Sequence, residues 1–297
     1  MLKKIILLFI ILCSVSGCDN TEKDERIQIV CTAFPQYDWA SELTKGAEDM
    51  FSITLLTDNG TDIHSFQPSA DDIISISSCD MLIYTGGESE KWVADAAKNS
   101  DAKIINMLSY VDSEDIHDHA PDEHTWLSLR DSAVICNEIS NSLKELLPEK
   151  KDLFQSNATR YSQSLERLDK EYQLAVDEAK NKILVFADRF PFSPMTGDYD
   201  LTCYAAFPGC SAESEASFET VANLASAIDE NNLDYVFVTD NSGLDLAKTV
   251  IENTLKKNQQ ILSLNSMQTV TEADLKSGLS YLDIMEENLE TLKIALN

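Results

Sequence analysis

The feature that most constrains the fold is a pattern of short apolar runs, repeated on each side of a long stretch without glycine or proline. Each run is almost continuously apolar, which is typical of strands that a parallel sheet buries on both faces. The runs lie at 27–33, 51–57, 80–86, 103–108, 182–187, 201–207, 234–240 and 260–265. Helical patterns separate them, at 69–78, 88–99, 216–230 and 243–257. The sequence therefore predicts an α/β protein of two lobes, each with a mainly parallel sheet flanked by helices.

The stretch between the two groups, 149–180, predicts one long helix that begins near Pro148. Apolar and small residues recur there at steps of four and three: Phe154, Ala158, Tyr161, Leu165, Leu168, Tyr172, Ala175 and Ala179. They form one seam on a helix of about 30 residues, roughly 45 Å long. A coiled-coil dimer stem is the alternative. We prefer a helix packed across both lobes that resists hinging, because the seam lacks paired flanking charges.

The N-terminus reads as an export signal. Lys3 and Lys4 precede an apolar segment, 5–15, that is too short to span a bilayer as a helix. Val15-Ser16-Gly17-Cys18 resembles the lipidation site of bacterial lipoproteins. We expect a mature chain that begins at Cys18 and is lipid-anchored at the outer face of the bacterial cytoplasmic membrane. The alternative is a plain secretory signal with an incidental cysteine. The predicted units are a signal peptide at 1–17, a tether at 18–25, an N-terminal lobe at 26–148, a linking helix at 149–180 and a C-terminal lobe at 181–297.

Charge and cysteine content exclude several classes of protein. The formal charge of −28 argues against nucleic acid and anionic lipid headgroups as surface partners. It would attract cations, although solubility alone explains such a balance. Beyond the signal region there are five cysteines, Cys31, Cys79, Cys136, Cys203 and Cys210, with no C-x-x-C spacing, so neither a disulfide framework nor a zinc ribbon is indicated. We expect the first three to be buried fillers, while Cys203 and Cys210 are a candidate pair.

All four histidines lie between residues 64 and 124. His64 and His124 stand at apparent connections from strand to helix, which makes them candidates for metal coordination by imidazole; the alternative is two ordinary surface histidines. His117 and His119 lie in an acidic loop, 114–123. That loop is a candidate for transient metal capture, and a plain solvated loop is the alternative.

These features together resemble the zinc and manganese solute-binding lipoproteins of ABC importers. The resemblance rests on the lipidation site, two lobes joined by one long helix, and the segments DIHSFQPSADDI (62–73), CDMLIYTGGESEKWV (79–93), DEHTWLS (122–128) and 265–296. It implies that His64 and His124 are the two first-lobe ligands of a zinc ion, or of manganese. It also implies a membrane permease as partner and a monomeric receptor.

The second lobe departs from the family pattern. The family's third ligand is a His or Glu, and Arg189 falls at that position here, with Asp188 beside it. The fourth ligand is an Asp, and Asn265 takes its place. Arginine has only donors and cannot ligate a metal, whereas Asn offers a neutral carbonyl oxygen. In the interpretation we prefer, Asp188 joins the two histidines, and Asn265 or water completes the tetrahedron.

Two other interpretations follow from the same residues. In the first, the metal site is degraded and Arg189 makes a salt bridge or binds an anionic group, so the protein is an adhesin, a scaffold or a receptor for another ligand. In the second, the protein is a zinc hydrolase. The chain lacks H-E-x-x-H and G-x-S-x-G and has only nine glycines, which disfavours enzymes of this kind. We therefore expect a binding protein without catalytic activity.

Overall fold

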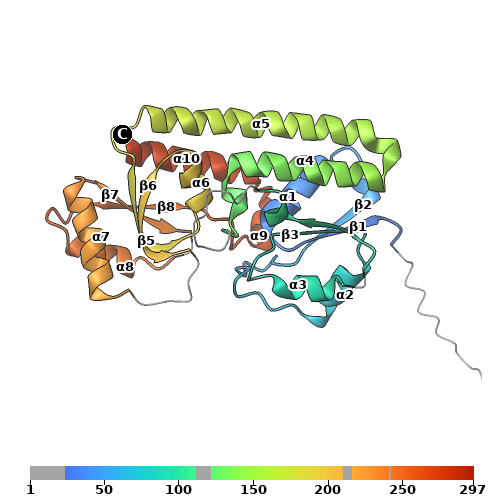
Figure 1. Ribbon diagram of the computed structural model, residues 1–297, viewed down its shortest axis with the longest axis horizontal. Coiled ribbons are helices and arrows are strands. Elements are labelled where there is room, and N and C mark those ends of the chain that lie inside the picture. Colours follow the sequence, from blue (N-terminus) through green and yellow to red (C-terminus); the bar gives the residue numbers. More distant parts are fainter. Residues whose placement is uncertain (1–23, 99, 112–121, 210–215, 241) are drawn as a thin grey trace, which may run out of the picture.

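The computed structural model describes residues 24–98, 100–111, 122–209, 216–240 and 242–297 as two α/β lobes side by side (Figure 1). The first lobe holds a parallel sheet in the order β2-β1-β3-β4. Its strands are β1 (Ile27–Cys31), β2 (Phe51–Leu55), β3 (Met81–Tyr84) and β4 (Lys103–Asn106).

The second lobe repeats this topology in the order β6-β5-β7-β8, again with parallel neighbours. Its strands are β5 (Ile183–Phe190), β6 (Thr202–Pro208), β7 (Tyr235–Thr239) and β8 (Gln260–Leu264). Every apolar run of the sequence is a strand, so the predicted fold class is confirmed. The carboxyl ends of the strands, where parallel sheets place their binding residues, carry the loops of interest.

Helices cover both sheets (Figure 1). They are α1 (Phe34–Leu43), α2 (Ala70–Ser78), α3 (Lys91–Ala96), α4 (Leu129–Leu146), α5 (Lys151–Asp177), α6 (Ser193–Asp198), α7 (Phe218–Glu230), α8 (Asp245–Glu252), α9 (Glu272–Ser277) and α10 (Tyr281–Leu296). Short 3-10 helices are η1 (Glu48–Met50), η2 (Met107–Ser109), η3 (Thr125–Leu127) and η4 (Pro148–Lys150). Capping boxes begin α2 at Ser69, α9 at Thr271 and α10 at Ser280, which satisfies otherwise unpaired N–H groups.

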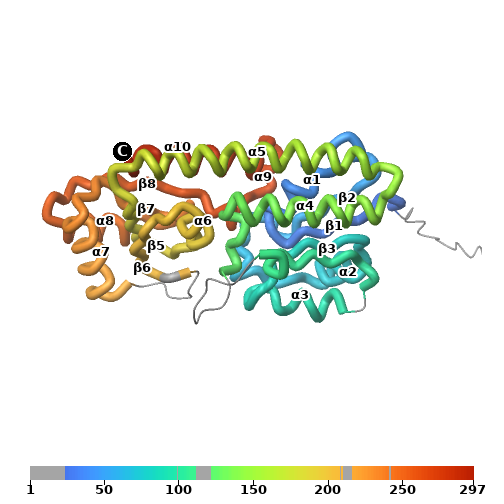
Figure 2. The backbone as a smooth tube through the Cα atoms, turned by 45° about the horizontal axis from the view of Figure 1, so that its top comes forward, coloured from blue at the N-terminus to red at the C-terminus, as the bar shows by residue number. Residues whose placement is uncertain are grey.

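The long helix α5 runs along both lobes (Figures 1 and 2). Its 27 residues span about 40 Å. The predicted seam is buried from Phe154 to Ala175, against α4 and α10, whereas Ala179 lies beyond the helix end and is half-buried. The seam is thus used within the chain, as expected for a packed helix.

The two lobes share one hydrophobic core, because α10 returns to the first lobe. Tyr281 of α10 makes an edge contact with Trp39 of α1, with ring centroids 5.2 Å apart. The Tyr281 hydroxyl donates to the main-chain carbonyl of Trp126 at 2.6 Å. On the other side of α10, the Tyr172 hydroxyl of α5 donates to the carbonyl of Met285 at 2.7 Å. The lobes are therefore tied by packing as well as by the linking helix.

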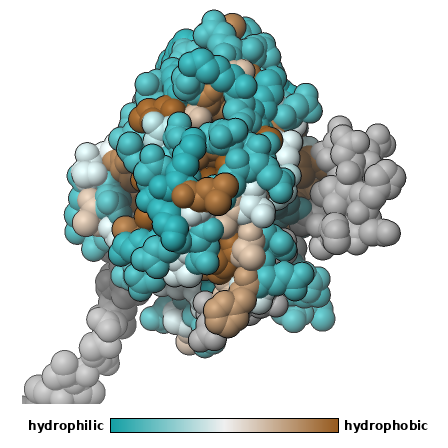
Figure 3. All heavy atoms as spheres, turned by 90° about the vertical axis from the view of Figure 1, so that its left-hand side faces the viewer, coloured by the Kyte–Doolittle hydropathy of each residue, from teal (hydrophilic) through white to brown (hydrophobic). Residues whose placement is uncertain are grey.

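Several sequence predictions fall outside the described residues, namely those on Cys18, His117, His119 and Cys210. Cys31, Cys79 and Cys136 are buried as predicted, and Cys203 is half-buried. None of the helices within the described ranges is long and apolar enough to cross a bilayer. The end face of the second lobe is mainly hydrophilic with scattered apolar side chains (Figure 3).

Candidate metal centre

The two histidines that the sequence singled out lie against each other. Their Nε2 atoms are 3.0 Å apart and their ring centroids 5.1 Å apart, although 60 positions separate His64 from His124. His64 follows β2, and His124 immediately precedes η3. The His124 side chain is only 4% exposed, against 19% for His64. The fold thus brings two imidazoles to one point at the carboxyl end of the first sheet.

Each imidazole is oriented through its other ring nitrogen. His124 Nδ1 lies 2.6 Å from Asp122 Oδ1, and His64 Nδ1 lies 2.6 Å from the Ser89 hydroxyl oxygen. Burial raises the pKa of Asp122, but its hydrogen bonds and charge interaction with His124 outweigh that effect and hold the pKa below its ordinary value. The ionised carboxylate accepts the Nδ1 proton of His124, which leaves a lone pair on Nε2. A carboxylate behind a histidine is a common support of metal ligands.

Glu123 holds the loop that carries Ser89. Its Oε1 accepts the main-chain N–H groups of Glu88 at 2.6 Å and of Ser89 at 3.1 Å. Gly87 has φ +82°, and a Cβ there would collide with the Glu123 carboxylate, so glycine is required for this close approach. The second oxygen, Oε2, lies 3.7 Å from His64 Nδ1 and is buried without a hydrogen-bond partner in the described part of the chain. Glu123 therefore fixes Ser89 and places negative charge behind His64.

A cavity of about 350 Å³ lies where the second lobe meets this site. Its lining includes the carboxylates of Asp62, Asp188 and Asp240, the guanidinium of Arg189 and the carboxamide of Gln268. Both second-lobe residues at the predicted third-ligand position, Asp188 and Arg189, thus lie in this cavity.

The Asp188 carboxylate is held by protein donors. Oδ2 accepts from the main-chain N–H of Thr239 at 2.9 Å and from its hydroxyl at 2.5 Å, while Oδ1 accepts from the N–H of Arg189 at 2.8 Å. The register of β5 against β6 shifts between Phe186 and Arg189, just where these residues lie. Such bulges redirect side chains at binding sites.

Asn265, the predicted fourth ligand, builds a turn after β8. Its Oδ1 accepts from the N–H of Met267 at 2.8 Å. The side chain of Asn288 binds both main-chain groups of Asn265, the N–H at 2.8 Å and the carbonyl at 2.9 Å. The carbonyl oxygen that the sequence offered to a metal therefore stabilises this turn in the structure.

Gln268 is the residue that the sequence argument missed. Its Nε2 lies 3.1 Å from His124 Nε2 and 3.4 Å from Asp62 Oδ1. No motif marks a lone glutamine, and its only sequence signal was its place three residues after Asn265. The histidine pair thus contacts the second lobe through an amide rather than a carboxylate.

The structure gathers only part of the predicted ligand set. In the described ranges there is no group of three or more His, Cys, Asp and Glu side chains placed to hold one metal ion. His64 and His124 are together, whereas Asp188 is bonded to Thr239 and Asn265 to Met267. Metal binding by these four residues stays a prediction.

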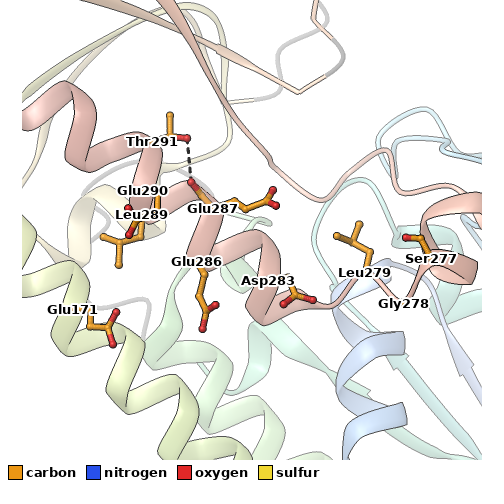
Figure 4. Close-up of a pocket in the computed structure, with 10 residues that line it drawn as sticks. All are labelled: Glu171, Ser277, Gly278, Leu279, Asp283, Glu286, Glu287, Leu289, Glu290 and Thr291. Atoms are coloured by element: carbon orange, nitrogen blue, oxygen red, sulfur yellow. Dashed lines mark hydrogen bonds between the residues drawn. The ribbon is translucent and has the colours of Figure 1, made fainter.

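A larger cavity of about 910 Å³ lies away from these residues, between α5 and α10 (Figure 4). Exposed carboxylates line it, from Glu171, Asp283, Glu286, Glu287 and Glu290. No imidazole or thiol joins them. We regard this groove as part of the solvated acidic surface.

Comparisons with known proteins agree with the fold and the histidine pair. Residues 29–295 match the family described as zinc-uptake complex component A, periplasmic (ZnuA). The zinc-binding lipoprotein AdcA of Streptococcus pneumoniae is 30% identical over 314 residues, which cover 98% of this chain and 61% of that protein. The high-affinity zinc uptake system protein ZnuA of Bacillus subtilis is 25% identical, over 95% of this chain and 93% of that protein.

Solved structures show the same similarity. The Zn(II)-bound ZnuA-like domain of Streptococcus pneumoniae AdcA superposes with a TM-score of 0.74 at 28% identity, covering 91% of this chain and 99% of that one. The metal-dependent lipoprotein YcdH of Bacillus subtilis has a TM-score of 0.78 at 25% identity, with 91% and 99% covered. The chain therefore spans 61% of the length of the AdcA protein, and nearly all of its ZnuA-like domain.

Proposed function

The chain belongs to the family of the periplasmic zinc-uptake complex component A, and from this premise we propose that it is an extracytoplasmic receptor for a divalent transition metal. Zinc is the favoured cargo and manganese the alternative. The receptor captures the ion between its two lobes and delivers it to the membrane permease of an ABC importer.

The observation that carries this proposal is the 3.0 Å separation of the two Nε2 atoms of His64 and His124. Both Nδ1 atoms have oxygen partners on the opposite side of the rings. Two nitrogens that bind one zinc ion tetrahedrally at about 2.0–2.1 Å lie roughly 3.3 Å apart. The rings need to separate by only a few tenths of an ångström to accept the ion, so the first-lobe half of the site is pre-organised.

We propose Asp188 as the charged ligand from the second lobe. It lies in the cavity at the lobe junction, and binding would exchange its hydrogen bonds to Thr239 for a bond to the metal. Asn265 keeps the role that the sequence predicted for it only if it releases Met267. Two imidazoles and one carboxylate suit zinc, and an incomplete protein shell permits release to a transporter.

The test is metal analysis followed by calorimetry with zinc and manganese. Wild-type protein purified without chelator should contain about one zinc ion, as one tetrahedral site requires. His64→Ala and His124→Ala should each abolish stoichiometric binding. The matched control is the double variant His117→Ala/His119→Ala, which changes the other two histidines and should barely alter equilibrium affinity. Wild-type protein that binds neither metal would overturn the proposal.

We also propose that Cys18 carries a lipid anchor and that the receptor works as a monomer without catalytic activity. The lipidation-site sequence supports the anchor, as does the printed description of the relative AdcA as a zinc-binding lipoprotein. Expected partners are the bilayer, through the anchor, and the permease.

A further inference from the structure

We propose that Gln268 is the second-lobe ligand that completes the shell around His64 and His124, binding the metal through Oε1 after its carboxamide turns over. This inference rests on the proposed function and names a residue in the place where the sequence predicted Asn265.

The contacts of His124 point to this role. Its Nε2 faces two nitrogens, His64 Nε2 at 3.0 Å and Gln268 Nε2 at 3.1 Å. Because Nδ1 shares its proton with Asp122, Nε2 is the acceptor, and the Gln268 amide donates to it. The same lone pair cannot accept this hydrogen bond and bind a metal ion. Metal binding therefore requires the Gln268 carboxamide to reorient.

Reorientation of the carboxamide costs little. The terminal torsion of glutamine is broad and roughly two-fold, so a half turn exchanges Nε2 and Oε1 with little change in shape. The turned amide presents its oxygen to the point that its N–H faced before. Its Nε2 lies 3.4 Å from Asp62 Oδ1 in the arrangement seen here. A carboxamide oxygen is a neutral ligand, weaker toward zinc than a carboxylate, which suits a receptor that has to release its cargo.

The backbone that carries Gln268 is fixed from three sides. Asp240 Oδ1 accepts from the N–H of Ser266 at 2.6 Å and from its hydroxyl at 2.9 Å. Trp126 Nε1 donates to the carbonyl of Ser266 at 2.9 Å. Met267 is buried with φ +64°, a left-handed conformation that a non-glycine residue holds only when its surroundings impose it. The position of Gln268 is therefore set by a rigid turn, and its side chain alone has to move.

The experiment is zinc calorimetry on Gln268→Leu and Gln268→Glu. If Gln268 is a ligand, Gln268→Leu should weaken zinc binding, by about 10- to 100-fold. If it only competes for the His124 lone pair, Gln268→Leu should bind zinc as tightly as wild type or more tightly. Gln268→Glu supplies a permanent carboxylate and should bind about tenfold more tightly or better. With Co²⁺ as probe, the visible absorption spectrum should change in both variants, because it reports the atoms bound to the metal.

Gln260→Leu and Gln260→Glu are the matched controls. Gln260 is exposed at the opposite end of β8, so these changes repeat the chemistry in the same lobe away from the site. Both should keep wild-type affinity and the wild-type Co²⁺ spectrum. If wild type binds zinc but Gln268→Leu binds equally well or better, this inference fails and the receptor function stands. If wild type binds no zinc or manganese, both fail.

Discussion

The indole N–H of Trp126, in the first lobe, donates a 2.9 Å hydrogen bond to the main-chain carbonyl of Ser266, in the second. Trp126 is two residues from His124, and Ser266 is two residues from Gln268. The bond therefore joins the backbones that carry the two sides of the candidate site. A second link lies nearby, where the N–H of Gly60 donates to the carbonyl of Val270 at 3.1 Å.

These links and the shared core predict that zinc binding moves the lobes only slightly, through loop and side-chain rearrangement rather than hinge closure. Small-angle X-ray scattering with and without zinc should give nearly the same radius of gyration. A change of several ångströms would contradict a rigid connection through α5 and α10.

Asp188→Ala should weaken zinc binding by an order similar to that of the histidine variants, because it removes the proposed charged ligand. Arg189→Ala is its neighbouring control and should leave affinity intact or tighten it, since a guanidinium near the site opposes a cation. Calorimetry of the two variants side by side decides the matter. If Asp188→Ala binds like wild type, the charged second-lobe ligand is elsewhere.

Stability should depend on the ionisation of Asp38, which lies on α1 within the shared core. Burial raises the pKa of Asp38 to about 7, whereas an unfolded Asp has a pKa of about 3.9. Between these values the folded protein holds a proton that the unfolded chain has lost, so the free energy of unfolding falls as pH rises from about 4 to about 7.

Asp38→Asn should remove this share of the slope and gain up to roughly 4 kcal/mol at pH 8. Urea denaturation at several pH values, with chelator present, measures it. Glu90, whose pKa burial also raises to about 7, should keep a slope of its own. The exposed Asp71→Asn on α2 is the control and should keep the wild-type pH profile. An unchanged slope in Asp38→Asn would refute the assignment.

Cys18→Ser should prevent lipid attachment, because a hydroxyl cannot replace the thiol that the predicted lipidation site requires. The variant should be released from the membrane or remain unprocessed. Cell fractionation measures this, with Cys13→Ser, inside the signal segment, as control. Finding the Cys18→Ser protein processed and membrane-held like wild type would exclude the anchor.

The sequence by itself determined the two-lobed fold, the strands of both sheets and the long helix between them. Continuous apolar runs and one seam from Phe154 to Ala175 are local patterns, and they report which residues must be buried. The same reasoning singled out His64 and His124, because histidine is scarce in this chain and both stand at strand ends.

Only the tertiary structure decided what those buried faces and polar side chains meet. Periodicity cannot show that α10 returns to the first lobe, or that α5 ends at Asp177. The roles of Asn265 and Gln268 depended on contacts made in space: Asn265 binds its own turn, while Gln268 reaches His124 across 144 positions. An amide has donors and an acceptor that serve a turn or a ligand equally well, so its role is fixed by the partner that the folded chain places beside it.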